Sequence, residues 1–102
     1  MNRNHLIHET RSLRMHGLIA EACLRDPKTV IHFARENLSR WRMSNVDCDD
    51  FAVWETILSG SQAGILHTLT STDETSVRLR KSSPFAGMIS AEDRNNILAS
   101  LK

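Results

Sequence analysis

Hydrophobic positions in this chain recur with the period of α-helices, and the first 26 residues show this most clearly. Between residues 4 and 26 an apolar stripe advances alternately by four and by three residues, which is the spacing of one helical face. Additional apolar residues surround the second half of this segment, which predicts that it packs against several neighbours as the central helix of the fold. The stripe consists of Leu6, Thr10, Leu13, Gly17, Ala20 and Leu24.

A second helix is predicted from residue 27 to about residue 43. Asp26 can cap it, and Pro27 suits its first position because the N–H that proline lacks would have no partner there. One face is apolar and includes Phe33 and Trp41. The opposite face carries a basic stripe, which is more typical of a solvated surface than of a phosphate-binding one. The stripe consists of Lys28, His32, Arg35, Ser39 and Arg42.

Two shorter helices are predicted after a polar, acidic stretch. Asp49 or Asp50 can cap a third helix that runs to about Leu58, and Ser61 can cap a fourth. This pair has the spacing of a DNA-reading helix-turn-helix, but residues 61–70 contain no Lys or Arg to meet phosphates. An antiparallel helical hairpin is therefore favoured.

The last third of the chain predicts two further helices separated by a loop. Ser71 and Glu74 have the spacing of a capping box, and Ser90 with Asp93 provides another capping-type start. Phe85 lies between them, outside any helical period. Its ring is predicted to fill a hydrophobic gap and pin the loop to the core.

Taken together, the patterns predict an all-α fold, a compact bundle of about five to six short helices in a single domain spanning residues 1–102. A chain of this length buries about 65% of its unfolded surface and needs no metal or disulfide to do so. Cys23 and Cys48 cannot form a disulfide scaffold and favour a reduced, cytoplasmic setting. No secretory signal and no membrane-spanning segment are expected.

The net charge of +1 hides a segmented distribution. Residues 1–42 carry eight basic and four acidic side chains, residues 43–77 carry six acidic and no basic ones, and residues 78–102 carry five basic and two acidic ones. Such asymmetry can steer a charged partner toward one face. Solvated faces whose charges pair across the fold are the more common outcome.

No catalytic or metal-binding constellation is recognisable in the sequence. His5 and His8 lie one helical turn apart, but a third metal ligand is missing. A small enzyme would require His67, Cys48 or His32 to converge from separate helices. We therefore predict no cofactor, no metal and no enzymatic activity.

A resemblance adds a functional expectation. Residues 78–87, RLRKSSPFAG, followed by SAEDR at residues 90–94, resemble a short pattern in small bacterial proteins, as do Arg35, Leu38 and Trp41 at intervals of three. The resemblance covers about residues 26–100. It implies an antitoxin-type or accessory protein whose partner is a toxin from a neighbouring gene. The resemblance also implies that some longer relatives carry an additional DNA-binding helix-turn-helix segment, and we expect no such segment in this chain.

The resulting hypothesis is a non-enzymatic protein-interaction module that neutralises a bacterial toxin or defence protein by occlusion. The acidic middle would cover a basic active site, cationic side chains would anchor the rim, and an aromatic ring would add an anchor if exposed. The partner-binding candidates are Asp47, Asp49, Asp50, Glu55, Asp73, Glu74, Arg78, Arg80, Lys81 and Phe85.

The alternative hypothesis is a DNA-binding transcriptional regulator. Its candidate nucleic-acid-binding residues are Lys28, Arg35 and Arg42, assisted by the basic cluster at residues 78–81. So few cations predict weak binding with a steep dependence on salt. Association of the chain with itself into a homo-oligomer is a further alternative that the sequence leaves open.

Overall fold

The structure is a computed structural model that describes residues 3–46 and 48–100. Six helices lie within these residues. No strand occurs among these residues, and the predicted all-α bundle is confirmed. No helix in this described part is both long and apolar enough to cross a membrane. In chain order the helices are α1 (Arg3–Arg25), α2 (Pro27–Met43), α3 (Asp49–Leu58), α4 (Gln62–Thr70), α5 (Glu74–Arg80) and α6 (Ala91–Ser100).

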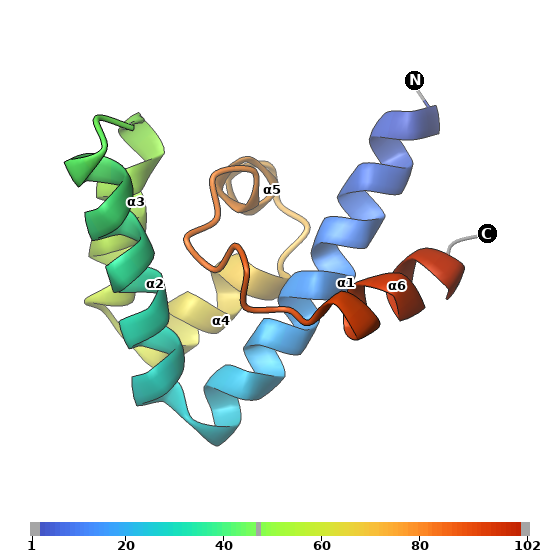
Figure 1. Cartoon of the computed structure of the whole chain (residues 1–102), viewed down its shortest axis with the longest axis horizontal. Coiled ribbons are helices and arrows are strands. Elements are labelled where there is room, and N and C mark those ends of the chain that lie inside the picture. Colours follow the sequence, from blue (N-terminus) through green and yellow to red (C-terminus); the bar gives the residue numbers. More distant parts are fainter. Residues whose placement is uncertain (1–2, 47, 101–102) are drawn as a thin grey trace.

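A sharp break separates the two longest helices, α1 and α2, which meet as a V (Figure 1). The side chain of Asp26 accepts a hydrogen bond from the backbone N–H of Thr29 at 3.4 Å, and Pro27 occupies the first helical position. The aspartate cap and the proline start predicted from the sequence are therefore confirmed.

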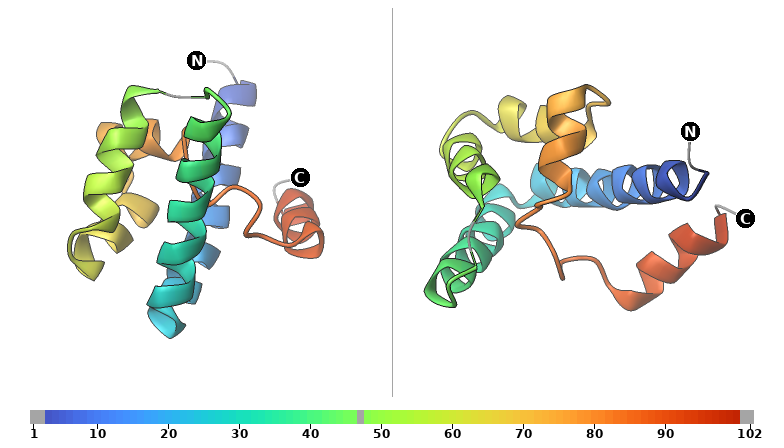
Figure 2. Two further views of the ribbon diagram at one scale, coloured as in Figure 1. Left: turned by 60° about the vertical axis from the view of Figure 1, so that its left-hand side comes forward. Right: turned by 90° about the horizontal axis from the view of Figure 1, so that it is seen from above.

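Helix α1 is the central element of the bundle, as its apolar surround predicted. It contacts α2, α4, α5 and α6. Seen from above, α4 and α5 lie on one side of α1 and α6 lies on the other (Figure 2). The second half of α1 is the buried part, with Ile19, Ala20 and Cys23 inside the core and His16 buried beside them.

The core is centred on Trp54, whose side chain is fully buried. Its indole N–H donates a hydrogen bond to the backbone carbonyl of Leu79 at 2.9 Å. Its ring meets that of Phe85 edge-on, with the ring centres 5.7 Å apart. Phe85 is 1% exposed, so its predicted role in the core is confirmed and its assignment as a partner-facing anchor is wrong.

The loop between α5 and α6 is held against the core by a side chain of α2. Asn37 of α2 is buried and donates from Nδ2 to the backbone carbonyls of Pro84 at 2.8 Å and Ala86 at 3.1 Å. Gly87 follows with a φ of 90°, a conformation that favours glycine because it has no Cβ. The SSPFAG segment, residues 82–87, thus packs against the core and helps to stabilise the fold.

Two of the predicted helix caps are present as expected. Ser61 accepts a hydrogen bond from the backbone N–H of Gly64 at 3.1 Å at the start of α4. Ser90 accepts one from the backbone N–H of Asp93 at 3.1 Å at the start of α6. Each hydroxyl satisfies a donor that has no partner within the helix itself.

Two other caps differ from the prediction. The cap position of α3 is Cys48, which makes no side-chain capping bond, and Asp49 and Asp50 lie inside the first turn, where a carboxylate is favourable to the helix dipole. Helix α5 is capped by Asp73 rather than Ser71. The Ser71 hydroxyl instead donates to the Asp73 carboxylate at 2.6 Å, because a charged carboxylate is the stronger acceptor.

Candidate functional site

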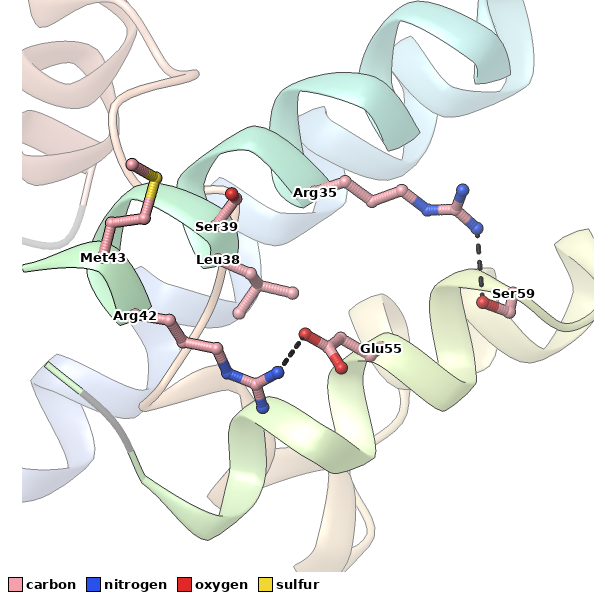
Figure 3. Close-up of a pocket in the computed structure, with 7 residues that line it drawn as sticks. All are labelled: Arg35, Leu38, Ser39, Arg42, Met43, Glu55 and Ser59. Carbon is pink, nitrogen blue, oxygen red and sulfur yellow. Dashed lines mark hydrogen bonds and ion pairs between the residues drawn. The ribbon is translucent and has the colours of Figure 1, made fainter. Parts of the chain in front are cut away.

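A groove runs between α2 and α3, with a volume of about 600 Å³ (Figure 3). Leu38, which is buried, lies at its base, and two arginines reach across from α2 toward α3. Methionine, serine and glutamate side chains complete the lining. The lining residues are Arg35, Leu38, Ser39, Arg42 and Met43 from α2, Glu55 from α3, and Ser59, which follows α3.

The two arginines of the groove tie α2 to α3. Arg42 lies 2.5 Å from Glu55, Nη1 to Oε1, in a pair whose side chains are 36% and 45% exposed. Arg35 donates from Nη2 to the backbone carbonyl of Leu58 and to the hydroxyl of Ser59, both at 3.3 Å. A cation is favourable there because the last carbonyls of a helix carry partial negative charge.

The basic stripe on α2 faces solvent, as favoured from the sequence, since Lys28, His32, Arg35 and Ser39 are exposed and Arg42 is half-buried. Arg35 and Arg42, which the alternative hypothesis assigned to DNA, also hydrogen-bond to α3. Lys28 lies near the start of α2 and is exposed. Of the three nucleic-acid candidates, two therefore already bind groups of α3 or the residue that follows it.

Large hydrophobic side chains are exposed mainly on α2, α3 and the turn between them, which together we call the α2–α3 hairpin. Met43, at the end of α2, is 82% exposed, Val46 in the turn is 53% exposed, and Val53 on α3 is 39% exposed. The fourth exposed large hydrophobic residue in the described part of the chain is Leu24, at the far end of α1. We refer to Val46 and the groove residues, which include Met43, together as the hairpin surface.

The turn that presents Met43 and Val46 is ordered by the backbone. The N–H of Val46 donates to the carbonyl of Trp41 at 2.7 Å, and Asn45 takes a φ of 64°, which asparagine tolerates better than most residues. Beneath it the rings of Trp41 and Phe51 stack with centres 5.4 Å apart. The hairpin surface is therefore a preorganised feature of the fold.

The acidic residues of the middle segment are largely engaged within the chain. Glu55 pairs with Arg42, and Asp50 lies 3.5 Å from Nε of Arg78 on α5. Asp73 lies 2.8 Å from the ring of His67, which is exposed. The cross-fold pairing that the charge pattern favoured is thus present.

Asp73 is also the best-satisfied carboxylate of the set. Hydrogen bonds from the Ser71 hydroxyl and from the backbone and side chain of Ser76 hold its pKa well below the usual range. Asp49 and Glu74 are exposed in the first turns of α3 and α5. Asp47 lies outside the described residues. These positions leave Asp49 and Glu74 as the most accessible acidic candidates.

The basic partner-binding candidates at α5 also include both a buried side chain and exposed ones. Arg80 is 6% exposed, and its Nη1 donates to the backbone carbonyls of Thr68 at 2.9 Å and Ser71 at 2.7 Å. Its assignment to the rim of a partner interface is therefore wrong, because the side chain closes the α4–α5 connection instead. Arg78 is exposed and paired with Asp50, and Lys81 is exposed.

One polar pair, between buried His16 and partly buried Ser83, was not predicted from the sequence. His16 on α1 lies 2.7 Å from the carbonyl of Ser12 through Nδ1 and 2.8 Å from the Ser83 hydroxyl through Nε2. A carbonyl only accepts, so Nδ1 carries the hydrogen and Nε2 accepts from Ser83. Burial lowers the pKa of His16, which favours this neutral form. The only sequence signal was a histidine within an apolar helical segment.

The two thiols lie in different environments. Cys23 is buried and Cys48 is exposed. Burial raises the pKa of the Cys23 thiol. Among the residues whose placement the structure describes, no group of three or more histidine, cysteine or acidic side chains could hold a metal ion.

Comparison of the chain with protein-family models, with curated proteins and with solved structures finds no match.

Proposed function

We propose that this chain is a non-enzymatic protein-interaction module that binds its partner through the hairpin surface. The observation that carries the proposal is the coincidence, on one helical hairpin, of a groove with an apolar base and an exposed methionine at its end. Arginine and methionine are enriched at protein interfaces, and buried anchors in shaped pockets supply most of the binding energy.

The charges of the groove suit reversible binding. The Arg42–Glu55 pair is more than one-third exposed on both sides, so its net contribution to the stability of the fold is small. Either side chain can therefore exchange its intramolecular partner for one across an interface at little cost. Asp49, in the first turn of α3, adds an exposed negative charge to the same hairpin.

The partner expected from the resemblance is a toxin-like protein from a neighbouring gene, which the chain neutralises by occlusion. The hairpin surface, which includes Glu55, replaces the rest of the acidic middle as the main contact, since Asp50 and Asp73 are engaged within the chain. Partner recognition then depends on shape and apolar contact, with Asp49 and Glu74 as accessory charges.

The direct test is co-expression of the tagged chain with the product of the adjacent gene. A stoichiometric complex on size-exclusion chromatography, together with relief of any growth arrest that the partner causes alone, would support the proposal. Absence of a complex with an intact, folded chain would reject it. Tight duplex-DNA binding that falls steeply with salt would instead support the regulator alternative.

A further inference from the structure

A second cavity, of about 220 Å³, lies on the side of α1 that faces the α5–α6 loop and the start of α6. In Figure 1 this loop and α6 pass in front of α1. One part of the cavity lining is apolar and is formed by Met15, Ile19, Phe85 and Ile89. Another part is cationic and is formed by Arg80, Lys81 and Arg94.

The cationic lining comes from two separate elements, which the fold brings to one cavity. Arg80 and Lys81 lie at the end of α5, and Arg94 lies in the first turns of α6. None of the side chains that line the cavity in the described structure is acidic. A negatively charged ligand would therefore meet favourable charge and no lining carboxylate.

Of the three cations, Arg80 is already hydrogen-bonded within the fold. Its Nη1 is bound to two backbone carbonyls, and the charges of Asp73 and Glu9 oppose the effect of burial on its pKa. Lys81 and Arg94 are exposed, so they can turn toward a ligand without disturbing the core.

The uncharged polar groups of the cavity are the His16–Ser83 pair. The Ser83 hydroxyl donates to His16 and accepts from the backbone N–H of Phe85 at 3.2 Å. These bonds fix the orientation of the hydroxyl at the edge of the apolar part. The cavity thus combines fixed neutral polar groups, accessible cations and a hydrophobic surface.

We propose that this cavity binds a small organic anion, with a carboxylate or phosphate group at Lys81 and Arg94 and an apolar body against Met15, the partly exposed apolar residue of the lining. The apolar lining favours an anion that has an apolar part, and a volume of about 220 Å³ suits a small molecule. The site involves none of the residues of the hairpin surface, so it stands independently of the proposed interaction function.

The test is an NMR titration of the ¹⁵N-labelled full chain with phenyl phosphate and, separately, with benzoate. We expect saturable shifts of backbone amides in residues 80–94 with at least one of the two, and the tighter ligand identifies the preferred charged group. Benzyl alcohol, which lacks the charge, and inorganic phosphate, which lacks the ring, should bind more weakly.

Matched charge variants locate the site. Arg94→Gln should weaken binding of the tighter probe about threefold to fivefold, as expected for one exposed charge, and Lys81→Gln with Arg94→Gln about tenfold. Lys28→Gln removes an equally exposed charge from α2 and should leave the affinity unchanged. The proposal is overturned if neither anion causes saturable shifts in residues 80–94, if benzyl alcohol binds as tightly, or if Lys28→Gln weakens binding equally.

Discussion

Trp54 and Leu79 are joined by a buried hydrogen bond, 2.9 Å from the indole nitrogen of α3 to the backbone carbonyl of α5. The same carbonyl accepts from the N–H of Ser82 at 3.0 Å, at the start of the loop that carries Phe85. This relationship connects α3, α5 and the loop through one atom. A ring without an N–H donor could fill the same space but could not make this bond.

Trp54→Phe should lower the free energy of unfolding by about 2 kcal/mol, because it removes the hydrogen bond and leaves part of the ring volume empty. Urea unfolding followed by circular dichroism measures the change. Trp41→Phe is the control, since Trp41 is only partly buried and its stacked contact with Phe51 can be retained. A loss at Trp54 no larger than the loss at Trp41 would contradict this role.

Phe85→Leu should cost about 1 to 2 kcal/mol of stability, since a smaller side chain in a close-packed site leaves a cavity. The substitution should leave partner binding unchanged when measured where both proteins are fully folded. Chemical denaturation and a binding titration give the two numbers. Loss of binding with unchanged stability would restore Phe85 as an exposed anchor.

Stability should fall when the pH is lowered because of His16. Burial places its pKa in the folded state below that in the unfolded state, so the unfolded chain binds more protons between the two values. The stabilisation is fully present above the unfolded pKa, near 6.5, and is lost as the pH falls through the lower folded value. Arg80, whose charge also disfavours protonation of His16, acts in the same direction.

The measurement is the free energy of unfolding at a series of pH values between 5 and 8 for the wild type and for His16→Gln. Gln can still hydrogen-bond to Ser12 or Ser83 but cannot titrate in this range. The difference between the two proteins should therefore grow in favour of the wild type as the pH rises. Parallel curves for the two proteins would exclude a role for His16.

The Arg42–Glu55 pair should contribute less than about 1 kcal/mol of coupling energy, because both side chains are substantially exposed. A double-mutant cycle with Arg42→Gln and Glu55→Gln measures this coupling in the free chain. A coupling well above that value would mean that the pair mainly stabilises the hairpin, contrary to its assignment as an exchangeable interface element.

The helices were predictable from the sequence because their signals are local. The Asp26–Pro27 start and the caps at Ser61 and Ser90 depend on residues within a few positions of one another. Where two acceptors compete nearby, as Ser71 and Asp73 do, spacing alone selected the wrong one. The packing of Phe85 followed from its position outside any helical period.

The site residues were less predictable because their partners are distant in the chain. Arg42 pairs with Glu55, 13 residues away, Asn37 holds a carbonyl 47 residues away, and His16 meets Ser83 across 67 residues. Helical periodicity places a residue on a face but does not say which other helix covers that face.

The most direct measurement of the central claim compares two exposed hydrophobic residues by isothermal titration calorimetry with the purified partner. Met43→Glu places a charge on the hairpin surface, whereas Leu24→Glu places the same charge at the far end of α1. We predict that Met43→Glu weakens binding at least about tenfold and that Leu24→Glu changes it by less than about twofold. Equal effects, or a larger effect at Leu24, would contradict the assignment of the interface to the hairpin.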